Sequence, residues 1–354
     1  MMDYNTIIND DCLHAMQGLE DNSIDSIVTD PPYGLSFMGK DWDHGIPGVV
    51  FWQEALRIAK PGCHLLAFGG TRTFHRLAVA IEDAGWDIRD TLMWVYGSGF
   101  PKSHNLKGEW QGYGTALKPA WEPIIMARKP LKGTVAENVL KHGTGAINID
   151  GCRVIVGEGR EQQQGRDGAL GPVPICGPRN GGKVYPVTLG RFPANLIHDG
   201  SDEVVSGFPN DTSRFFYCAK ASKSERNMGC EGLPLPDDNL QGLDTRGRTL
   251  VREDGSKTLV ERWKGTPRQN NHPTVKPLAL MRYLCRLVTP PDGVVLDPFC
   301  GSGSTLVGAL QEGFRYLGIE KDPDYVNIAY HRTKGALREM GKEAKQMALQ
   351  EVAS

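Results

Sequence analysis

Two short stretches of this chain carry residues whose types and spacing could do chemistry. The first is the run from Asp30 to Tyr33 (DPPY), and the second is the run from Asp297 to Gly303 (DPFCGSG). A carboxylate and a tyrosine on a proline-stiffened turn offer hydrogen-bond acceptors and a stacking face. Two closely spaced glycines let the backbone approach a ligand. The first stretch could therefore hold and orient a polar group, while the second could hold a cofactor.

Each stretch directly follows a segment that reads as a buried strand, 23–29 (SIDSIVT) and 293–296 (GVVL). The prolines fix φ and push Asp30 away from helical geometry. The Asp30 carboxylate, the Pro31 carbonyl and the Tyr33 ring are therefore expected on a stiff turn at a strand's carboxyl end. Open α/β sheets bind their ligands at this edge.

The second stretch predicts a nucleoside ligand. After Gly303 the sequence indicates a helix and then a strand, 315–319, which ends in Glu320. A carboxylate in this place can accept hydrogen bonds from both ribose hydroxyls. Leu306 stands where a Gly-x-Gly-x-x-Gly fingerprint needs its last glycine, so the pattern departs from a dinucleotide cradle.

The order of apolar segments predicts an α/β fold. Strand and helix patterns alternate over residues 4–84 and again over 271–335, which favours a mostly parallel sheet with helical crossovers. With 354 residues, 40% apolar and 23% charged, the chain could form one large domain with an insertion or two smaller domains. Segment 34–47, rich in Gly and Asp, is expected to be a mobile loop beside the site.

Composition gives few hints about partners or location. The net charge of −2 does not indicate a polyanion partner, so any nucleic-acid contact must be local. The eight cysteines include no Cys-x-x-Cys pair, and neither a metal site nor a disulfide framework is expected. No apolar window is long enough to span a bilayer, and the N-terminus lacks a signal-peptide pattern. We expect a soluble, cytoplasmic protein.

Residues 131–265 differ in character and are interpreted as an insertion. Glycine and proline become frequent, and no helical period persists. One cluster combines the aromatic run 215–217 with basic residues, as phosphate contacts and base stacking require. A solvated face beside a small core explains this cluster equally well. The candidate DNA-binding residues are Arg214, Lys220, Lys223 and Arg226.

Three motifs in this order resemble the DNA amino-methyltransferases: DPPY at 30–33, HPTVKP at 272–277 and DPFCGSG at 297–303. The arrangement is similar to the β group of that family, in which the catalytic motif precedes the cofactor motif. The resemblance covers residues 4–128 and 270–335 and implies a Rossmann-like S-adenosylmethionine-dependent methyltransferase fold. The expected organisation is a catalytic half, an inserted target-recognition region, a cofactor half and a surface helical tail, with bounds 1–130, 131–265, 266–335 and 336–354.

The resemblance also implies roles for individual residues. Glu320 would hold the ribose of S-adenosylmethionine, Thr274 and Lys276 would approach its methionine carboxylate, and Asp11 would meet its adenine amine; for Asp11 a plain helix N-cap is the alternative. Ser304 stands where many relatives have threonine and keeps the hydroxyl. The residues expected to line the rest of the cofactor pocket are Asp297, Phe299, Gly301 and Gly303. The expected catalytic residues are Asp30, Pro31, Pro32 and Tyr33.

The chemistry of the DPPY motif suits methylation of an exocyclic base amine. The lone pair of such an amine is delocalised into the ring, so acceptors must bind its N–H groups and turn the lone pair toward the methyl group. Asp30 and the Pro31 carbonyl are such acceptors, and Tyr33 can stack on a base swung out of the duplex. Methylation of cytosine C5 typically uses a Pro-Cys nucleophile, and the chain has no Pro-Cys dipeptide.

Within the family, an aspartate opening this motif favours adenine N6, and cytosine N4 is the alternative. An RNA or protein-amide methyltransferase and a non-catalytic DNA-binding module also stay open. Double-stranded DNA is the expected partner. The sequence leaves a homodimer and a restriction-endonuclease partner open.

Overall fold

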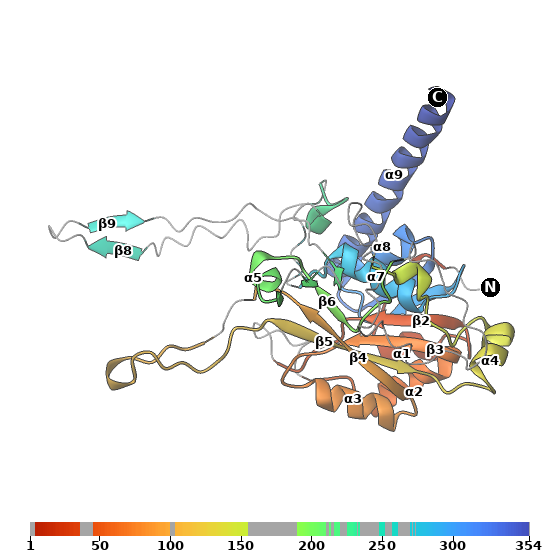
Figure 1. Ribbon diagram of the computed structural model, residues 1–354, viewed down its shortest axis with the longest axis horizontal. Helices are drawn as coiled ribbons and strands as arrows, with labels where there is room; N and C mark the ends of the chain where they lie inside the picture. The colour runs from red at the N-terminus through yellow and green to blue at the C-terminus, as the bar shows by residue number, and fades with distance from the viewer. Residues whose placement is uncertain are drawn as a thin grey trace, which may run out of the picture.

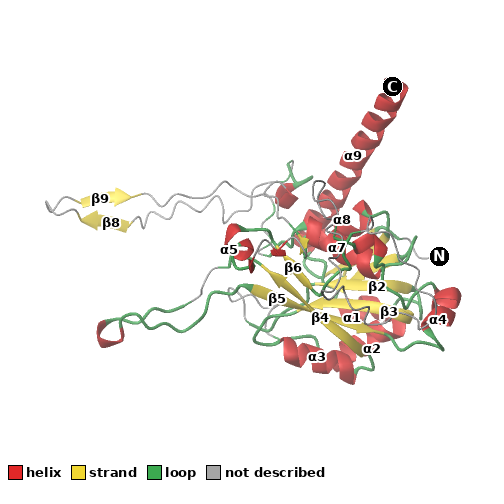
Figure 2. Ribbon diagram, viewed as in Figure 1, coloured by secondary structure: helices red, strands yellow, loops and turns green. Residues whose placement is uncertain are grey.

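The computed structural model describes residues 4–35, 45–99, 103–154, 190–209, 212–213, 216–219, 225–231, 233, 248–251, 257–260, 270, 272 and 274–353. Within these residues the chain forms one large mixed sheet between two helical layers (Figures 1 and 2). The strand order is β1-β11-β10-β2-β3-β5-β4-β6-β7. The strands are β1 (Thr6–Asn9), β2 (Ile24–Thr29), β3 (Ala59–Phe68), β4 (Asp87–Val95), β5 (Trp121–Arg128), β6 (Leu196–His198), β7 (Tyr217–Cys218), β10 (Val294–Asp297) and β11 (Arg315–Glu320).

The sheet changes its winding direction between β10 and β2, which are parallel neighbours. From β10 the chain runs through α8 (Ser304–Gln311) to β11 on one side. From β2 it runs through α2 (Val49–Ile58) to β3 on the other side. This is the topological switch point at which open α/β sheets bind ligands. The Rossmann-like α/β fold expected from the sequence is confirmed.

Strand β5 alone runs against its neighbours among the strands of this sheet that the structure describes. It pairs antiparallel with both β3 and β4. The amino end of β5 therefore lies at the same edge as the carboxyl ends of the parallel strands. This reversal brings Glu122 to the edge at which Asp30 emerges.

Alternation along the central strands divides the core between two faces. Leu65 and Ala67 point into a cluster with α1 (Cys12–Gln17), α2 and α3 (Phe74–Asp83). Leu66 and Phe68 point into the opposite cluster with α7 (Leu278–Val288) and α8. Because each fully buried aliphatic side chain contributes about 1.5–3 kcal/mol, this two-sided burial holds the strand ends firmly in place.

Parts of the segment predicted as an insertion are continuous with the main sheet. Strand β6 pairs parallel with β4, and β7 pairs parallel with β6. In α4 (Val135–His142), the buried Asn138 Nδ2 donates to the Pro61 carbonyl at 2.8 Å. The remaining described elements of the segment are η4 (Asp150–Cys152), α5 (Asp202–Val205), η7 (Glu225–Asn227) and the paired strands β8 (Arg248–Val251) and β9 (Lys257–Val260).

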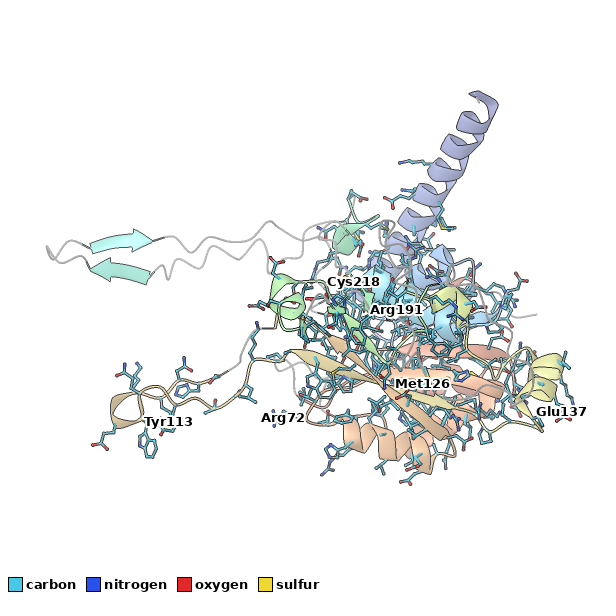
Figure 3. The ribbon with its side chains drawn as sticks, viewed as in Figure 1. Arg72, Tyr113, Met126, Glu137, Arg191 and Cys218 are labelled. Carbon is cyan, nitrogen blue, oxygen red and sulfur yellow. The ribbon has the colours of Figure 1, made fainter. Side chains whose placement is uncertain are left out.

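An arm and a long helix project from the body. Residues 103–120 form an arm that carries η3 (Gly108–Trp110) and Tyr113 near its tip, where the two aromatic rings of Trp110 and Tyr113 meet edge to face (Figure 3). Helix α9 (Pro323–Ala353) packs on the sheet at its start and then extends outward (Figure 1), so the expected boundary at 335/336 falls inside a continuous helix. No helix in the described part of the chain combines the length and apolar character that a membrane span needs.

Candidate active site

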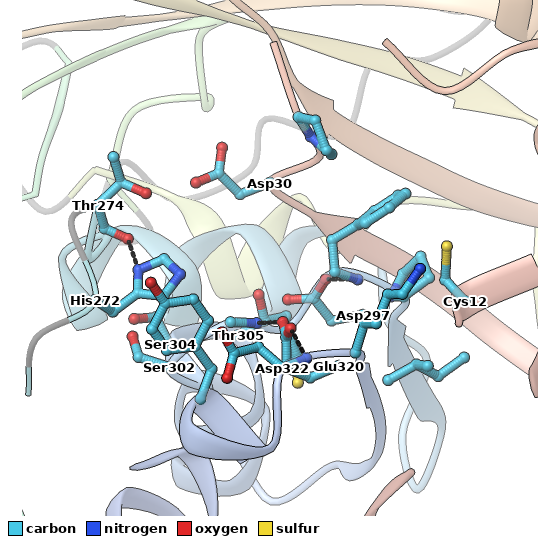
Figure 4. A pocket seen from close by; sticks show the side chains of 18 of the residues that line it. Cys12, Asp30, His272, Thr274, Asp297, Ser302, Ser304, Thr305, Glu320 and Asp322 are labelled. Carbon is cyan, nitrogen blue, oxygen red and sulfur yellow. Dashed lines mark hydrogen bonds between the residues drawn. The ribbon is translucent and has the colours of Figure 1, made fainter. Parts of the chain in front are cut away.

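A cavity of about 750 Å³ lies at the switch point, where β1, β2, β10 and β11 end. Figure 4 shows Asp30 and Thr274 on one side of this cavity and Glu320 and Asp322 on the other. Pro31, Tyr33 and Gly303 do not line it. The sequence-predicted residues in its wall are Asp11, Asp30, Pro32, Thr274, Lys276, Asp297, Phe299, Gly301 and Glu320.

The Asp30 carboxylate is part of a tight polar cluster. Its Oδ2 accepts from the Lys276 ammonium at 2.7 Å, and its Oδ1 accepts from the Tyr33 hydroxyl at 2.7 Å. Glu122 joins the cluster through its Oε2, which lies 3.0 Å from the Tyr33 hydroxyl and 3.2 Å from Lys276 Nζ. The strand end thus presents a carboxylate whose orientation is fixed by two donors.

The ionisation of this cluster follows from burial and charge. Burial alone would lower the pKa of Lys276, but the carboxylates of Asp30 and Glu122 outweigh it and raise that pKa, so the ammonium stays charged. Burial, together with the same two carboxylates, raises the pKa of Tyr33 well above its usual value, so the phenol stays neutral. The cluster therefore holds a charged ammonium and a neutral phenol between the side chains of Asp30 and Glu122.

Lys276 contacts the catalytic turn as well as the cavity. The Lys276 ammonium contacts Asp30 and Glu122 and lies 4.7 Å from the Phe68 ring centre, and its contact with a cofactor carboxylate stays a prediction. Its side chain is almost fully buried and also lines the cavity. Lys276 thus links the cofactor wall to the catalytic turn.

Asp297 has a structural task at the end of β10. Its Oδ1 accepts from the Thr29 hydroxyl at 2.7 Å and from the Phe299 amide at 3.1 Å. Burial raises the Asp297 pKa to about 6, although hydrogen bonds from Thr305, Thr29 and Phe299 oppose this shift. Asp297 therefore ties β10 to β2 and fixes the turn that follows.

The glycine turn is shaped by close contacts. Gly301 has φ of +48°, and a Cβ there would lie 2.6 Å from Nε2 of His272. Gly303 has φ of +78°, and a Cβ there would lie 2.9 Å from the Cβ of Ala329 in α9. Gly301 thus forms cavity wall, while Gly303 permits helix packing behind the turn, and its expected role toward the cofactor stays a prediction.

Glu320 faces the same turn from the end of β11. Its Oε2 accepts from the Gly301 amide at 2.9 Å, and its Oε1 accepts from the Asp322 amide at 2.8 Å. Burial raises its pKa, and the hydrogen bonds to the Asp322 and Gly301 amides oppose this. Because each carboxylate oxygen has a second lone pair, both oxygens can still accept from a ribose diol.

Asp11 is both the N-cap of α1 and part of the cavity wall. Its Oδ1 accepts from the Leu13 amide at 3.1 Å as the N-cap of α1, and its side chain lines the cavity. At the same end, His14 Nδ1 lies 2.5 Å from Oδ2 of Asp10. The acidic end of the cavity can accept hydrogen bonds from an amine.

The donor and acceptor set fits the nucleoside cofactor expected from the sequence. Glu320 offers acceptors for a diol, Asp11 lies at an acidic end, and the glycine turn removes side chains from the intervening wall. Among the described residues, no group of three His, Cys, Asp or Glu side chains converges in a way that would hold a metal ion.

The basic candidates are only partly within the described residues. Arg214, Lys220 and Lys223 lie outside them. Arg226 is half-buried in η7 and donates to the backbone carbonyls of Asn270 and His272. These contacts hold the chain that leads to Thr274 and Lys276. Segment 36–44 of the expected loop also lies outside the described residues.

Two site residues escaped the sequence reasoning. Glu122 is the second residue of β5, just before the apolar run 123–127, and its position at the site depends on the reversed direction of that strand. His272 is the first residue of HPTVKP, and its Nδ1 lies 2.8 Å from the Thr274 carbonyl. Burial lowers the His272 pKa to about 4, so its ring is neutral where it packs against the glycine turn.

A model of the DNA methylase family, covering N6 and N4 methyltransferases, matches residues 24–331. The chain is 23% identical over 385 residues to the type II methyltransferase M.HindIII of Haemophilus influenzae, covering 92% of this chain and 94% of that protein. Among solved structures, it is similar to the M1.HpyAVI–SAM complex (16% identity, 93% and 98% coverage, TM-score 0.42). It is also similar to the cytosine-N4-specific PvuII DNA methyltransferase (14% identity, 94% and 87% coverage, TM-score 0.47). The match of the family model over most of the chain shows that this protein belongs to the N6/N4 family of DNA methylases.

Proposed function

We propose that this DNA methylase transfers the methyl group of S-adenosylmethionine to the N6 amine of adenine in duplex DNA. The observation that carries the proposal is the position of Asp30, an acceptor at the cavity that also holds the glycine turn and Glu320. A target amine and a cofactor methyl group can therefore meet at one place. When bound, S-adenosylmethionine supplies an electrophilic methyl group on a sulfonium.

The chain's own residues then have defined tasks. Asp30 accepts a hydrogen bond from the target amine, and the Pro31 carbonyl is placed by its ring to accept the second. These acceptors turn the amine lone pair toward the methyl group, so transfer is direct and no covalent bond to the base is needed. The Tyr33 ring offers a stacking face that offsets part of the few kcal/mol needed to extrude a base.

Glu320 and Asp11 would hold the two ends of the cofactor's nucleoside. Glu320 keeps acceptor capacity on both oxygens beside the Gly301 amide. Asp11 also lines the cavity and can accept from the adenine amine. The cavity thus separates a cofactor end from the acceptor end at Asp30.

The first experiment identifies the methylated nucleoside. The purified protein is incubated with labelled S-adenosylmethionine and unmethylated genomic DNA, and the digested nucleosides are identified by mass. N6-methyladenine is the expected product, and sequencing of the same DNA would give the recognition site. N4-methylcytosine would contradict the choice of base, and labelled RNA or protein without labelled DNA would contradict the DNA substrate.

A further inference from the structure

Glu122 is a partly buried carboxylate that the transfer chemistry above does not use. It lies on β5, facing Asp30 across the carboxyl end of the sheet, and its side chain is 20% exposed. Burial and the Glu122 carboxylate together raise the pKa of the Tyr96 phenol, which follows β4. Glu122 also shares the Tyr33 hydroxyl and the Lys276 ammonium with the catalytic residue Asp30.

The Tyr33 hydroxyl has one hydrogen to donate and two carboxylates within hydrogen-bond distance. The neutral Tyr33 phenol has one proton, yet its oxygen lies 2.7 Å from Asp30 Oδ1 and 3.0 Å from Glu122 Oε2. The hydroxyl can donate to only one of them at a time. Lys276 differs, because its ammonium has three hydrogens and can contact Asp30 at 2.7 Å, Glu122 at 3.2 Å and the Tyr33 oxygen at 3.2 Å at the same time.

The two arrangements have different consequences for Asp30. When Tyr33 donates to Asp30, Oδ1 accepts from the phenol and Oδ2 accepts from Lys276, which leaves one lone pair open on each oxygen. When Tyr33 donates to Glu122, Oδ1 loses its competing donor, and both of its lone pairs are open to a target amine. The second arrangement requires a rotation of the phenol hydrogen and no movement of the heavy atoms, because both distances already suit a hydrogen bond.

We propose that Glu122 is a positioning residue for methyl transfer, which accepts the hydrogen bond of the Tyr33 hydroxyl in place of Asp30 when the target amine arrives. The inference rests on the proposed function, since it needs an amine at Asp30. Glu122 does not touch the base. It acts by keeping an alternative acceptor next to the catalytic carboxylate, so that the enzyme can hold Asp30 rigidly before substrate binding and release it afterwards.

The test compares Glu122→Met, which has a similar size and accepts poorly, with Glu122→Gln, which keeps one acceptor oxygen. Single-turnover methylation of DNA is measured, and binding of S-adenosylhomocysteine is measured by calorimetry as a readout of the folded cofactor site. Glu122→Met should slow transfer about 10- to 100-fold with S-adenosylhomocysteine affinity retained. Glu122→Gln should recover a large part of that loss. Glu54→Gln, equally exposed at 20% and paired with Arg57 on α2, is the matched control.

A second variant separates this role from a general structural one. Tyr33→Phe removes the competing hydroxyl and keeps the ring, so it should rescue much of the rate lost in Glu122→Met. The inference would be overturned if Glu122→Met slowed methyl transfer equally in the presence of Tyr33 and of Tyr33→Phe. It would also be overturned if Glu122→Gln were as slow as Glu122→Met. If Glu122→Met does not bind S-adenosylhomocysteine, Glu122→Ala, which also removes the acceptor, takes its place and is judged by the same two comparisons. A wild-type protein that methylates no base would instead refute the proposed function.

Discussion

Two aspartates of this protein occupy equivalent places and have different tasks. Asp30 and Asp297 end neighbouring parallel strands, β2 and β10, and each is followed by proline. Asp297 is 2% exposed and is surrounded by neutral donors, the Thr29 hydroxyl and the Phe299 amide among them. Asp30 is less buried and has a cationic partner, Lys276. One aspartate fixes a turn, and the other presents a charge to the cavity.

The difference shows that the neighbours, more than the dipeptide, decide what a strand-end aspartate can do. Neutral donors and full burial hold the Asp297 carboxyl in place and raise its pKa to about 6. A buried ammonium and a phenol orient Asp30 while leaving it at the cavity wall. Changing each aspartate should therefore alter different properties, and the following variants test this division from the largest expected effect to the smallest.

Asp30→Ala should reduce methyl transfer by roughly a thousandfold or more, because the amine loses its principal acceptor. Affinity for S-adenosylhomocysteine should change by no more than a few-fold, since Glu320 and the glycine turn are untouched. Single-turnover kinetics and calorimetry measure the two quantities. Asp83→Ala, at the exposed end of α3, is the control. Normal turnover in Asp30→Ala would show that Asp30 takes no part in methyl transfer and does not differ from Asp297 in the way described.

Gly301→Val should lower affinity for S-adenosylhomocysteine by about a hundredfold or more. A β-branched residue such as valine rarely adopts a backbone φ of +48°, and its Cβ would collide with the half-buried His272 ring. Gly341→Val in α9 is the control, because a Cβ at that position meets nothing within 4 Å. Calorimetry on both variants checks the effect. Retained affinity in Gly301→Val would show that the turn does not form the cofactor wall.

Asp297→Asn should change the pH dependence of stability. Because the folded pKa of about 6 exceeds the unfolded value, Asp297 favours folding most at low pH and this contribution is lost as pH rises toward and through 6. Asparagine has no such titration. Relative to wild type, the free energy of unfolding of Asp297→Asn should therefore gain on the order of 1 kcal/mol between pH 5 and 7.5. Urea unfolding across this range measures it, and a constant difference would mean that Asp297 does not titrate there.

Arg226→Ala should have the smallest effect, a loss of S-adenosylhomocysteine affinity of about three- to tenfold, because Arg226 supports the chain around His272. The slope of log DNA affinity against log salt should stay the same. A phosphate contact would instead make that slope shallower by about one. Filter binding at several salt concentrations distinguishes a structural role from a phosphate contact. A shallower slope in Arg226→Ala would indicate that Arg226 contacts DNA.

The sequence alone determined the local elements and the chemistry at their ends. Apolar periodicity located β2 and β10, and the prolines and glycines that follow them predicted turns at the sheet edge. The carboxylate of Glu320 after β11 was predicted in the same way. These signals are local, since each depends on the backbone preferences and burial of a few consecutive residues.

Only the tertiary structure decided which partners these residues have. The reversal of β5 brings Glu122 to Asp30, although they are far apart in the chain, and Lys276 reaches both from the segment before α7. The packing of α9 against Gly303 gave that glycine its task. Such contacts depend on strand direction and helix packing, which arise from long-range burial. A pattern of neighbouring residues therefore locates a carboxylate but cannot tell what holds it.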